Sequence, residues 1–293
     1  MSITNLRSAL VLTCKESILD SSHPPPPSHL FGRDYYLQKI TEIIRSKILS
    51  GAGAWLVIGG PGGIGKTSVA LAIFHSTACI PHTKRFFIPC RPVTPTLTFL
   101  SAIASSLDVD ITHGDPLKLV INTLQAEKIP LMLVFDNAES FWFDYKIQPR
   151  ARTIPRYICS IRTITLLLTS RGTERPNVTL WDPFPLLGPL TLPYAREAFL
   201  QIATDLEPDV SLDNLLKMVD CVPLALSLLA RRCQIMGESA ASLCSRWERE
   251  HIELLKLGGI EADDNIDISI KLSLDSPLMI GNGDALRLLS IVS

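Results

Sequence analysis

Apolar residues in the middle of the chain stand in short, nearly continuous runs separated by segments of helical periodicity. The runs cover residues 54–58, 85–89, 131–136, 163–169 and, more weakly, 178–181. Short apolar runs that alternate with helices are typical of a parallel sheet buried on both faces. We therefore predict an α/β fold of the P-loop NTPase type, with a parallel sheet and helices on both of its faces.

Beyond about residue 190 the apolar residues follow helical spacing alone. Segments with this spacing cover residues 194–203, 211–219, 223–235 and 240–257. Apolar positions three and four residues apart give each helix one face that packs against a core. The pattern predicts a second, all-helical unit after the sheet.

These patterns divide the chain into four parts. A segment that ends in a proline-rich linker covers residues 1–28, the nucleotide-binding sheet unit covers 29–190, and the helical unit covers 191–260. Four consecutive prolines at 24–27 favour a stiff linker at the first boundary. Residues 261–293 begin a third unit, whose apolar pattern runs to the last residue without a stop signal. We expect this last unit to be cut short.

Composition narrows the class of protein. The chain has 293 residues, of which 46% are hydrophobic, and its formal net charge is −1. A net charge near zero gives no electrostatic attraction to nucleic acids or anionic membranes, so we expect neither as a partner. Seven scattered cysteines without metal-ligand spacing favour free thiols in a reducing compartment. No apolar run reaches the ~18 residues of a membrane helix, so we expect a soluble, cytoplasmic protein.

The strongest chemical signal is the stretch at residues 60–67, which fits the phosphate-loop pattern G-x-x-x-x-G-K-[ST] between a predicted strand and a predicted helix. Glycines let consecutive backbone N–H groups surround phosphate oxygens, and the helix N-terminus adds further donors. Lys66 is expected to reach the β- and γ-phosphates, and the Thr67 hydroxyl to bind Mg2+. The candidate nucleotide-binding residues of this stretch are Gly60, Pro61, Gly62, Gly63, Ile64, Gly65, Lys66, Thr67 and Ser68.

Candidate acidic residues follow the third predicted strand. Asp136 ends the apolar run and is a candidate catalytic residue and Mg2+ ligand. Asn137 stands where many such ATPases carry a second acid that polarises water, and an amide cannot act as a base. Glu139 could take that catalytic role if the turn directs it inward, and a solvated loop acid is the alternative. Slow turnover, or turnover that depends on a partner, is therefore expected.

The fourth predicted strand ends at a candidate phosphate sensor, Arg171. An arginine at the carboxyl end of such a strand faces the ligand crevice, where it can sense or neutralise a γ-phosphate. Arg175, in the same loop, is the rival candidate. The chain lacks the N-K-x-D sequence with which relatives of this superfamily read guanine, and this favours ATP and ADP as ligands.

Taken in order, these segments resemble the nucleotide-binding core of the STAND ATPases. The likeness is closest to the NB-ARC/NACHT-type module of plant and fungal NOD-like receptors and of the apoptotic-protease activating factor. Residues 60–67 are similar to the family's Walker A motif, residues 133–136 to its Walker B motif, and residues 168–171 to its sensor strand. The resemblance covers roughly residues 29–293.

Two weaker motifs of the family have counterparts here. LFGRD at residues 30–34 is similar to the family's hhGRE motif, which lies against the adenine, so the resemblance implies nucleotide contacts for Phe31, Gly32 and Arg33. CVPLA at residues 221–225 resembles the GLPLA motif of the helical domain. That likeness implies that Pro223 contacts the adenine.

The chain also departs from the family pattern. Asp34 stands for the family's glutamate, the pair Cys221 and Val222 replaces Gly-Leu, and Asn137 replaces the second acid. Residues 270–276 look like the start of the family's winged-helix domain, but the histidine with which that domain contacts the ADP β-phosphate has no counterpart. Autoinhibition by a complete winged helix is therefore in doubt.

The resemblance implies a switch in signal transduction and innate immunity. ADP would hold the sheet unit and the helical unit together, and exchange for ATP would open them, favour self-association through the nucleotide-binding domain and bring an unidentified downstream effector into play. Two alternatives stay open. One is a turning-over ATPase of AAA+ type, and the other is a scaffold derived from this module that no longer exchanges nucleotide.

Overall fold

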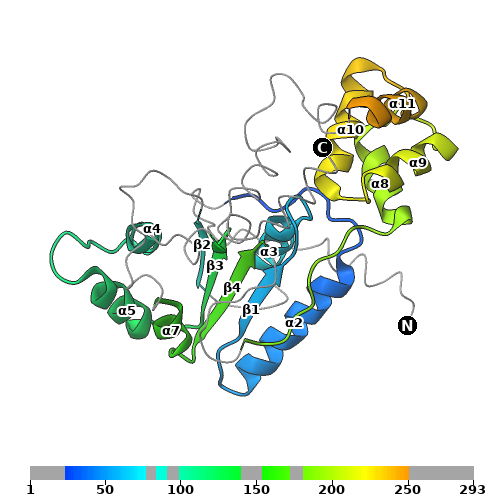
Figure 1. Ribbon diagram of the computed structural model, residues 1–293. Helices are drawn as coiled ribbons and strands as arrows, with labels where there is room; N and C mark the ends of the chain where they lie inside the picture. The colour runs from blue at the N-terminus through cyan, green and yellow to red at the C-terminus, as the bar shows by residue number, and fades with distance from the viewer. Residues whose placement is uncertain (1–23, 77–83, 91–98, 140–153, 172–180, 251–293) are drawn as a thin grey trace, which may run out of the picture.

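A parallel sheet forms the centre of the molecule (Figure 1). The computed structural model describes residues 24–76, 84–90, 99–139, 154–171 and 181–250. Within these residues the sheet has four strands: β1 Trp55–Gly59, β2 Lys84–Pro89, β3 Leu131–Asp136 and β4 Ile164–Ser170. All pair in parallel, in the order β1-β4-β3-β2. The predicted parallel α/β sheet of the P-loop NTPase type is confirmed.

The register of the sheet brings three strand ends together. Gly59 at the end of β1 is opposite Ser170 of β4, and Phe135 of β3 is opposite Leu168. Asp136, the next residue of β3, therefore lies beside the end of β4. Because carboxyl ends of parallel strands meet at one edge, the residues that follow them share a single crevice.

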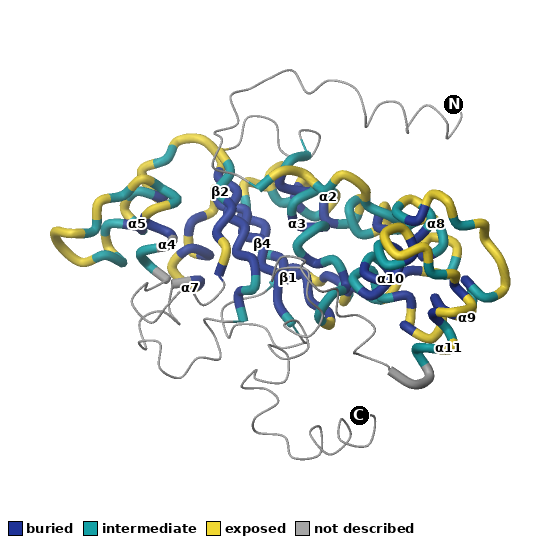
Figure 2. The backbone as a smooth tube through the Cα atoms, turned by 90° about the horizontal axis from the view of Figure 1, so that it is seen from above, coloured by how far each residue is buried: buried dark blue, intermediate teal, exposed yellow. Residues whose placement is uncertain are grey.

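Helices cover both faces of the sheet, as the strand pattern requires. On one face, α2 (Asp34–Leu49) and α3 (Lys66–His75) pack on Met132 and Val134. On the other face, α4 (Phe99–Ser106), α5 (Pro116–Ala126) and α7 (Ile154–Cys159) pack on Leu133 and Phe135. Successive side chains of β3 thus enter opposite cores, as a pleated strand dictates. Figure 2 shows the strands buried between these layers.

A helical unit follows the sheet, formed by α8 (Leu192–Ile202), α9 (Val210–Met218), α10 (Pro223–Met236) and α11 (Ala240–Glu250). It has its own core, in which the Phe199 side chain is fully buried. In Figure 1 this unit stands beyond one end of the sheet. The N-terminal helix expected within residues 1–22 and the third unit expected at 261–293 lie outside the described residues.

A linking segment, residues 181–190, joins the two units and covers the free edge of β1. The Asp182 N–H donates to the Trp55 carbonyl and the Leu187 N–H to the Gly59 carbonyl, both at 2.8 Å. The Asp182 carboxylate also accepts the Trp55 N–H at 2.9 Å and pairs with Lys47 at 2.7 Å. The segment contains Pro183 and Pro185, which cannot donate to a strand ladder. The weak strand predicted at 178–181 falls almost wholly outside the described residues.

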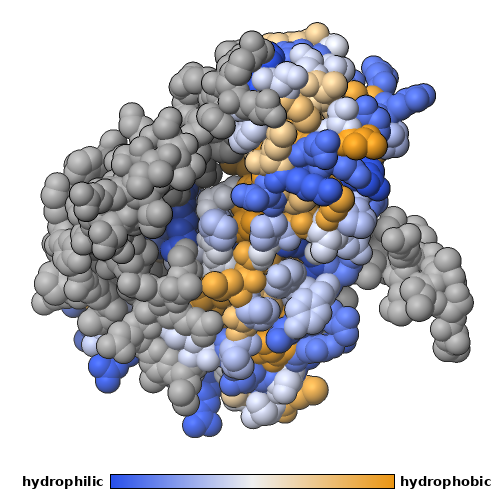
Figure 3. Space-filling model, turned by 45° about the vertical axis from the view of Figure 1, so that its right-hand side comes forward, coloured by the Kyte–Doolittle hydropathy of each residue, from blue (hydrophilic) through white to orange (hydrophobic). Residues whose placement is uncertain are grey.

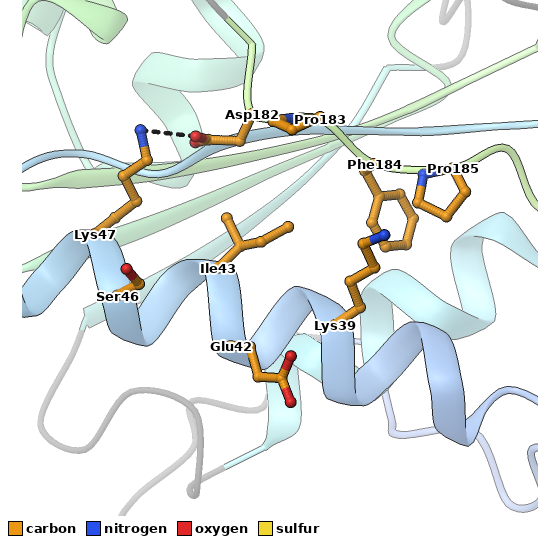
Figure 4. Close-up of a pocket in the computed structure, with 9 residues that line it drawn as sticks. All are labelled: Lys39, Glu42, Ile43, Ser46, Lys47, Asp182, Pro183, Phe184 and Pro185. Carbon is orange, nitrogen blue, oxygen red and sulfur yellow. Dashed lines mark ion pairs between the residues drawn. The ribbon is translucent and has the colours of Figure 1, made fainter.

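A groove of about 600 Å3 lies between α2 and the linking segment (Figure 4). Its lining comes from these two elements and includes Ile43, Phe184 and the Lys47–Asp182 ion pair. None of the phosphate-loop residues lines it. This groove is therefore separate from the predicted nucleotide site.

The surface carries hydrophobic side chains in small groups among hydrophilic ones on the face that Figure 3 shows. Among the described residues, no helix is both long enough and apolar enough to cross a membrane.

The turn before α10 holds a non-glycine residue in a left-handed conformation. Cys221 has φ 52°, and its side chain is buried in the core of the helical unit. The left-handed region costs an L-residue roughly 1–2 kcal/mol but costs glycine almost nothing. A glycine at position 221 would therefore avoid this cost.

We expect Cys221→Gly to be more stable than Cys221→Ala by about 1 kcal/mol, because both variants lose the thiol and only glycine relaxes at this φ. Urea unfolding of the two variants measures the difference. Cys233, buried inside α10, is the matched control. There the order should reverse, since glycine costs about 1 kcal/mol relative to alanine within a helix. The same order at both positions would contradict the strain at Cys221.

Candidate functional site

The phosphate loop, residues 60–67, joins β1 to α3 at the crevice. Gly63 and Gly65 have φ of 71° and 93°, so both need the left-handed region. A Cβ on Gly63 would lie 2.9 Å from Cβ of Leu224 in the helical unit. Gly63 therefore serves two purposes: it shapes the loop, and it lets α10 approach the loop closely.

Lys66 is buried at the start of α3, with 7% of its surface exposed. Its Nζ donates to the carbonyl oxygens of Gly60 at 2.9 Å and Pro61 at 2.8 Å. Burial lowers the pKa of Lys66 to about 8, while nearby Glu139 acts in the opposite direction. The ammonium is thus held within the loop. Phosphate oxygens bound there would stabilise its charge and offset the destabilising effect of burial.

The lowered pKa of Lys66 predicts that ATP binding takes up a proton near pH 8.5. A polyphosphate anion favours the ammonium and raises its pKa, so the free protein is mainly neutral at Lys66 there and the complex is charged. At pH 6.5 Lys66 is charged in both the free protein and the complex, so it contributes no proton uptake. Calorimetry in buffers of different ionisation enthalpy measures the uptake. Lys66→Arg, which keeps a fixed charge, should lose it; equal uptake in that variant would contradict the assignment to Lys66.

Asp136 is the centre of a hydrogen-bond cluster at the ends of β3 and β4. Its Oδ1 accepts from the Thr67 hydroxyl at 2.8 Å and from the Thr169 hydroxyl at 2.6 Å. Thr169 in turn accepts the backbone N–H of Asn137 at 2.8 Å, and Asn137 is left-handed with φ 58°. Thr169 was not a candidate in the sequence, although it stands two residues before Arg171. It fixes both the carboxylate and the turn that follows it.

The pair formed by Thr67 and Asp136 fits Mg2+. Hydroxyl and carboxylate oxygens are the ligands this ion prefers, and Mg2+ in nucleotide sites typically takes one or two protein oxygens and completes its shell with phosphates and water. No group of three or more His, Cys, Asp or Glu in the described ranges could hold a metal alone.

Glu139 and Arg171 meet in the same crevice. The Arg171 Nε lies 3.3 Å from the Glu139 Oε1, and both side chains are largely buried. Burial raises the pKa of Glu139, against the opposing effects of Lys66 and Arg171. The other carboxylate oxygen, Oε2, is buried with no hydrogen-bond partner in the described part of the chain. The turn therefore directs Glu139 inward rather than into solvent.

The residues implied by the family resemblance lie where the two units meet. Phe31 packs against the core of the helical unit, and an added Cβ on Gly32 would lie 2.6 Å from the Tyr194 ring. The Arg33 guanidinium is occupied by two backbone carbonyls, those of Gly188 and Ile64. A role for these residues in contact with adenine stays a prediction.

The remaining candidates differ in exposure. Pro61 is exposed, whereas the Ile64 side chain is fully buried in the core, so Ile64 can offer a ligand only its backbone. Ser68 is partly buried in the first turn of α3. Pro223 begins α10, and the Leu224 N–H donates to the Gly63 carbonyl at 3.1 Å. Gly62 lies in the turn of the loop, and Arg175 lies outside the described residues.

Solved structures with the same fold are P-loop ATPases. The ORC1 protein of Aeropyrum pernix, in complex with DNA, is 17% identical over 84% of this chain and 78% of its own, with a TM-score of 0.55. The ORC2 protein of the same organism, in ADPNP–ADP complexes, is 19% identical over 87% and 83%, with a TM-score of 0.55. A Walker-type ATPase of Pyrococcus abyssi is 14% identical over 78% and 75%, with a TM-score of 0.54.

These likenesses, with the phosphate loop and the parallel sheet, define the chain as having a P-loop NTPase fold. At such identities they show the fold and do not distinguish an NB-ARC/NACHT-type module from other branches. No protein-family model matches the chain, and no curated protein matches it in sequence.

The comparisons correct one expectation. The near-zero net charge led us to exclude nucleic acids as partners, but a similar structure was solved in complex with DNA. That exclusion is wrong, because net charge averages over the whole surface and says nothing about a local face.

Proposed function

We propose that the chain binds Mg–ATP and ADP in the crevice between the sheet and the helical unit and acts as a slowly hydrolysing, NOD-like-receptor-type nucleotide switch. The observation that carries this proposal is the hydrogen bond from the Leu224 N–H to the Gly63 carbonyl at 3.1 Å. Because the helical unit touches the phosphate loop directly, a nucleotide in the loop is adjacent to both units. The phosphates of the nucleotide can therefore change how the helical unit is positioned against the sheet unit.

In this proposal each side chain has a defined task. Lys66 exchanges its two loop carbonyls for phosphate oxygens, and the loop N–H groups hold the anion. Mg2+, held by Thr67 and Asp136, would neutralise developing charge on the β- and γ-phosphates. Thr169 keeps the Asp136 carboxylate directed at that position. Arg171 reads the γ-phosphate, which only ATP has.

Glu139 supports both the switch and its main alternative, a turning-over AAA+-type ATPase. A buried carboxylate with a raised pKa is a suitable base for the attacking water. In the described geometry, however, Arg171 engages it at 3.3 Å. In our proposal this ion pair keeps hydrolysis slow, and Arg171 releases Glu139 only when it turns to a γ-phosphate.

The test begins with purified protein. Denaturation should release about one equivalent of ADP, detected by chromatography; protein without nucleotide would favour a scaffold that no longer exchanges it. Steady-state hydrolysis should be far below ~1 s−1, the low end of typical enzyme turnover. Glu139→Gln should lower it by about a hundredfold if Glu139 is the base, while Asn137→Asp tests the neighbouring position. Rapid wild-type turnover that Glu139→Gln removes would replace the switch by the turning-over ATPase.

Because the similar ORC1 protein was solved in complex with DNA, the same assays should be repeated in the presence of DNA. Hydrolysis and bound-nucleotide exchange measured with and without duplex DNA would show whether DNA acts on this site. Stimulation by DNA would favour the AAA+-type ATPase hypothesis over a NOD-like-receptor switch.

The switch proposal also includes a cytoplasmic location for the protein.

A further inference from the structure

Two adjacent carbonyl groups of the phosphate loop are held by groups outside it. The Leu224 N–H, at the start of α10, donates to the Gly63 carbonyl at 3.1 Å. The Arg33 guanidinium donates through Nη2 to the Ile64 carbonyl at 2.9 Å. One contact comes from the helical unit and the other from the residue that precedes α2.

Arg33 also holds the linking segment. Its Nη1 donates to the Gly188 carbonyl at 2.8 Å. The side chain is buried, with 3% of its surface exposed, and the Tyr36 ring lies 5.6 Å from the guanidinium carbon. The ion pairs found among the described residues do not include Arg33. A buried cation whose hydrogen bonds go to two backbone carbonyls from different segments is a clasp, and the guanidinium fork suits that task as an ammonium does not.

The clasp has a consequence for the loop's donors. In a planar trans peptide the C=O and the following N–H point in opposite directions. With the Ile64 carbonyl held toward Arg33, the Gly65 N–H points away from Arg33. The Gly63 carbonyl, held by Leu224, orients the Ile64 N–H in the same manner. These are N–H groups of the kind that cradle phosphate.

The clasp also reaches the connection between the two units. Gly188 belongs to the linking segment, and two residues later the Leu190 N–H donates to the Cys221 carbonyl at 3.1 Å, just before α10. A rotation of the helical unit about this connection would therefore move the carbonyl that Arg33 holds. A change in the loop would move the other carbonyl on the same guanidinium.

We propose that Arg33 is a positioning residue that pre-orients the phosphate-binding N–H groups and couples them to the linking segment. This inference rests on the proposed nucleotide binding and assigns the regulation of that site. It differs from the adenine contact that the family resemblance implies for Arg33. A contact with adenine acts only on ligands that carry the base, whereas a clasp on the loop acts on the phosphates alone.

Tripolyphosphate, which has phosphates and no base, separates these roles. Arg33→Lys should weaken both ATP and tripolyphosphate by at least about tenfold, because an ammonium cannot hold both carbonyls. Arg45→Lys, an exposed arginine on α2, is the matched control and should change neither. Loss of ATP affinity alone would overturn the clasp in favour of the adenine contact, and unchanged affinity for both would overturn it outright. Wild-type protein that binds neither ligand would instead refute the proposed function.

Hydrogen exchange on the wild-type protein tests the coupling without any variant. Tripolyphosphate should slow exchange of the Ile64 and Gly65 amides and also of the Gly188 and Leu190 amides in the linking segment. Slower exchange in the loop with no change in the linking segment would overturn the coupling, even where Arg33→Lys does not fold. Where that variant folds, the change at Gly188 and Leu190 should disappear while the change in the loop remains.

Discussion

Replacing Lys66 by alanine is expected to lower the affinity for ATP by at least about a hundredfold. The ammonium lies within the loop, buried among carbonyl oxygens, and is the only lysine of residues 60–67. A buried charge–phosphate contact has little solvent screening and forms charge-assisted hydrogen bonds, so losing it costs several times a neutral hydrogen bond. Titration with a fluorescent ATP analogue, displaced by ATP, measures the change.

The same change should leave the fold intact. The lowered pKa of Lys66 means that the folded protein holds this ammonium at a cost in free energy, so its removal should not reduce the free energy of unfolding by more than the loss of side-chain packing. Lys118→Ala, at an exposed position on α5, is the control for removal of a lysine as such. ATP binding that survives Lys66→Ala unchanged would refute the assignment of residues 60–67 as the phosphate loop.

The elements that short stretches of sequence determine were predicted correctly. The strands that end at Asp136 and Ser170 are nearly continuous apolar runs, which are typical of strands buried on both faces. The phosphate loop is equally local, because its glycines and Lys66 lie within eight consecutive positions. The positions of these strands and of the phosphate loop could therefore be predicted from the sequence.

Contacts between distant segments could not be read in this way. The Arg33 clasp joins residues 155 and 31 positions apart, and the hydroxyl of Thr169 reaches a carboxylate 33 positions away. The family resemblance implied a nucleotide contact for Arg33, which stays a prediction, and nothing in the sequence indicated that its guanidinium donates to two backbone carbonyls. A residue's type limits which hydrogen bonds it can make, but the fold decides which partner is within reach.

The segment that runs beside β1 is a second feature that the sequence did not predict. Residues 181–190 contain three prolines and show little periodicity, so the sequence did not predict an ordered segment here. The segment is nevertheless fixed, because the Asp182 carboxylate takes the place of a strand carbonyl for the Trp55 N–H and also pairs with Lys47. A side chain that substitutes for backbone pairing leaves no repeating pattern in the sequence.

Asp136→Asn is expected to remove the effect of Mg2+ on ATP affinity and to lower hydrolysis by about a hundredfold, since a metal ion contributes several kcal/mol of charge stabilisation. The substitution is nearly isosteric, and an amide oxygen can still accept from Thr67 and Thr169. The variant therefore keeps the hydrogen-bond cluster and loses the negative charge that holds the ion. ATP affinity measured with Mg2+ and with a chelator gives the Mg2+ effect directly.

Asp182→Asn provides the matched control for Asp136→Asn, because Asp182 is also a buried aspartate but sits at the start of the linking segment. It should reduce stability through the weakened contact with Lys47 and leave the ratio of ATP affinities with and without Mg2+ unchanged. If Mg2+ strengthens ATP binding to Asp136→Asn as much as to the wild type, the ion is not held by Asp136. The γ-phosphate sensing assigned to Arg171 would then have to operate around a metal bound elsewhere in the crevice, and the pairing of Thr67 with Asp136 would be structural.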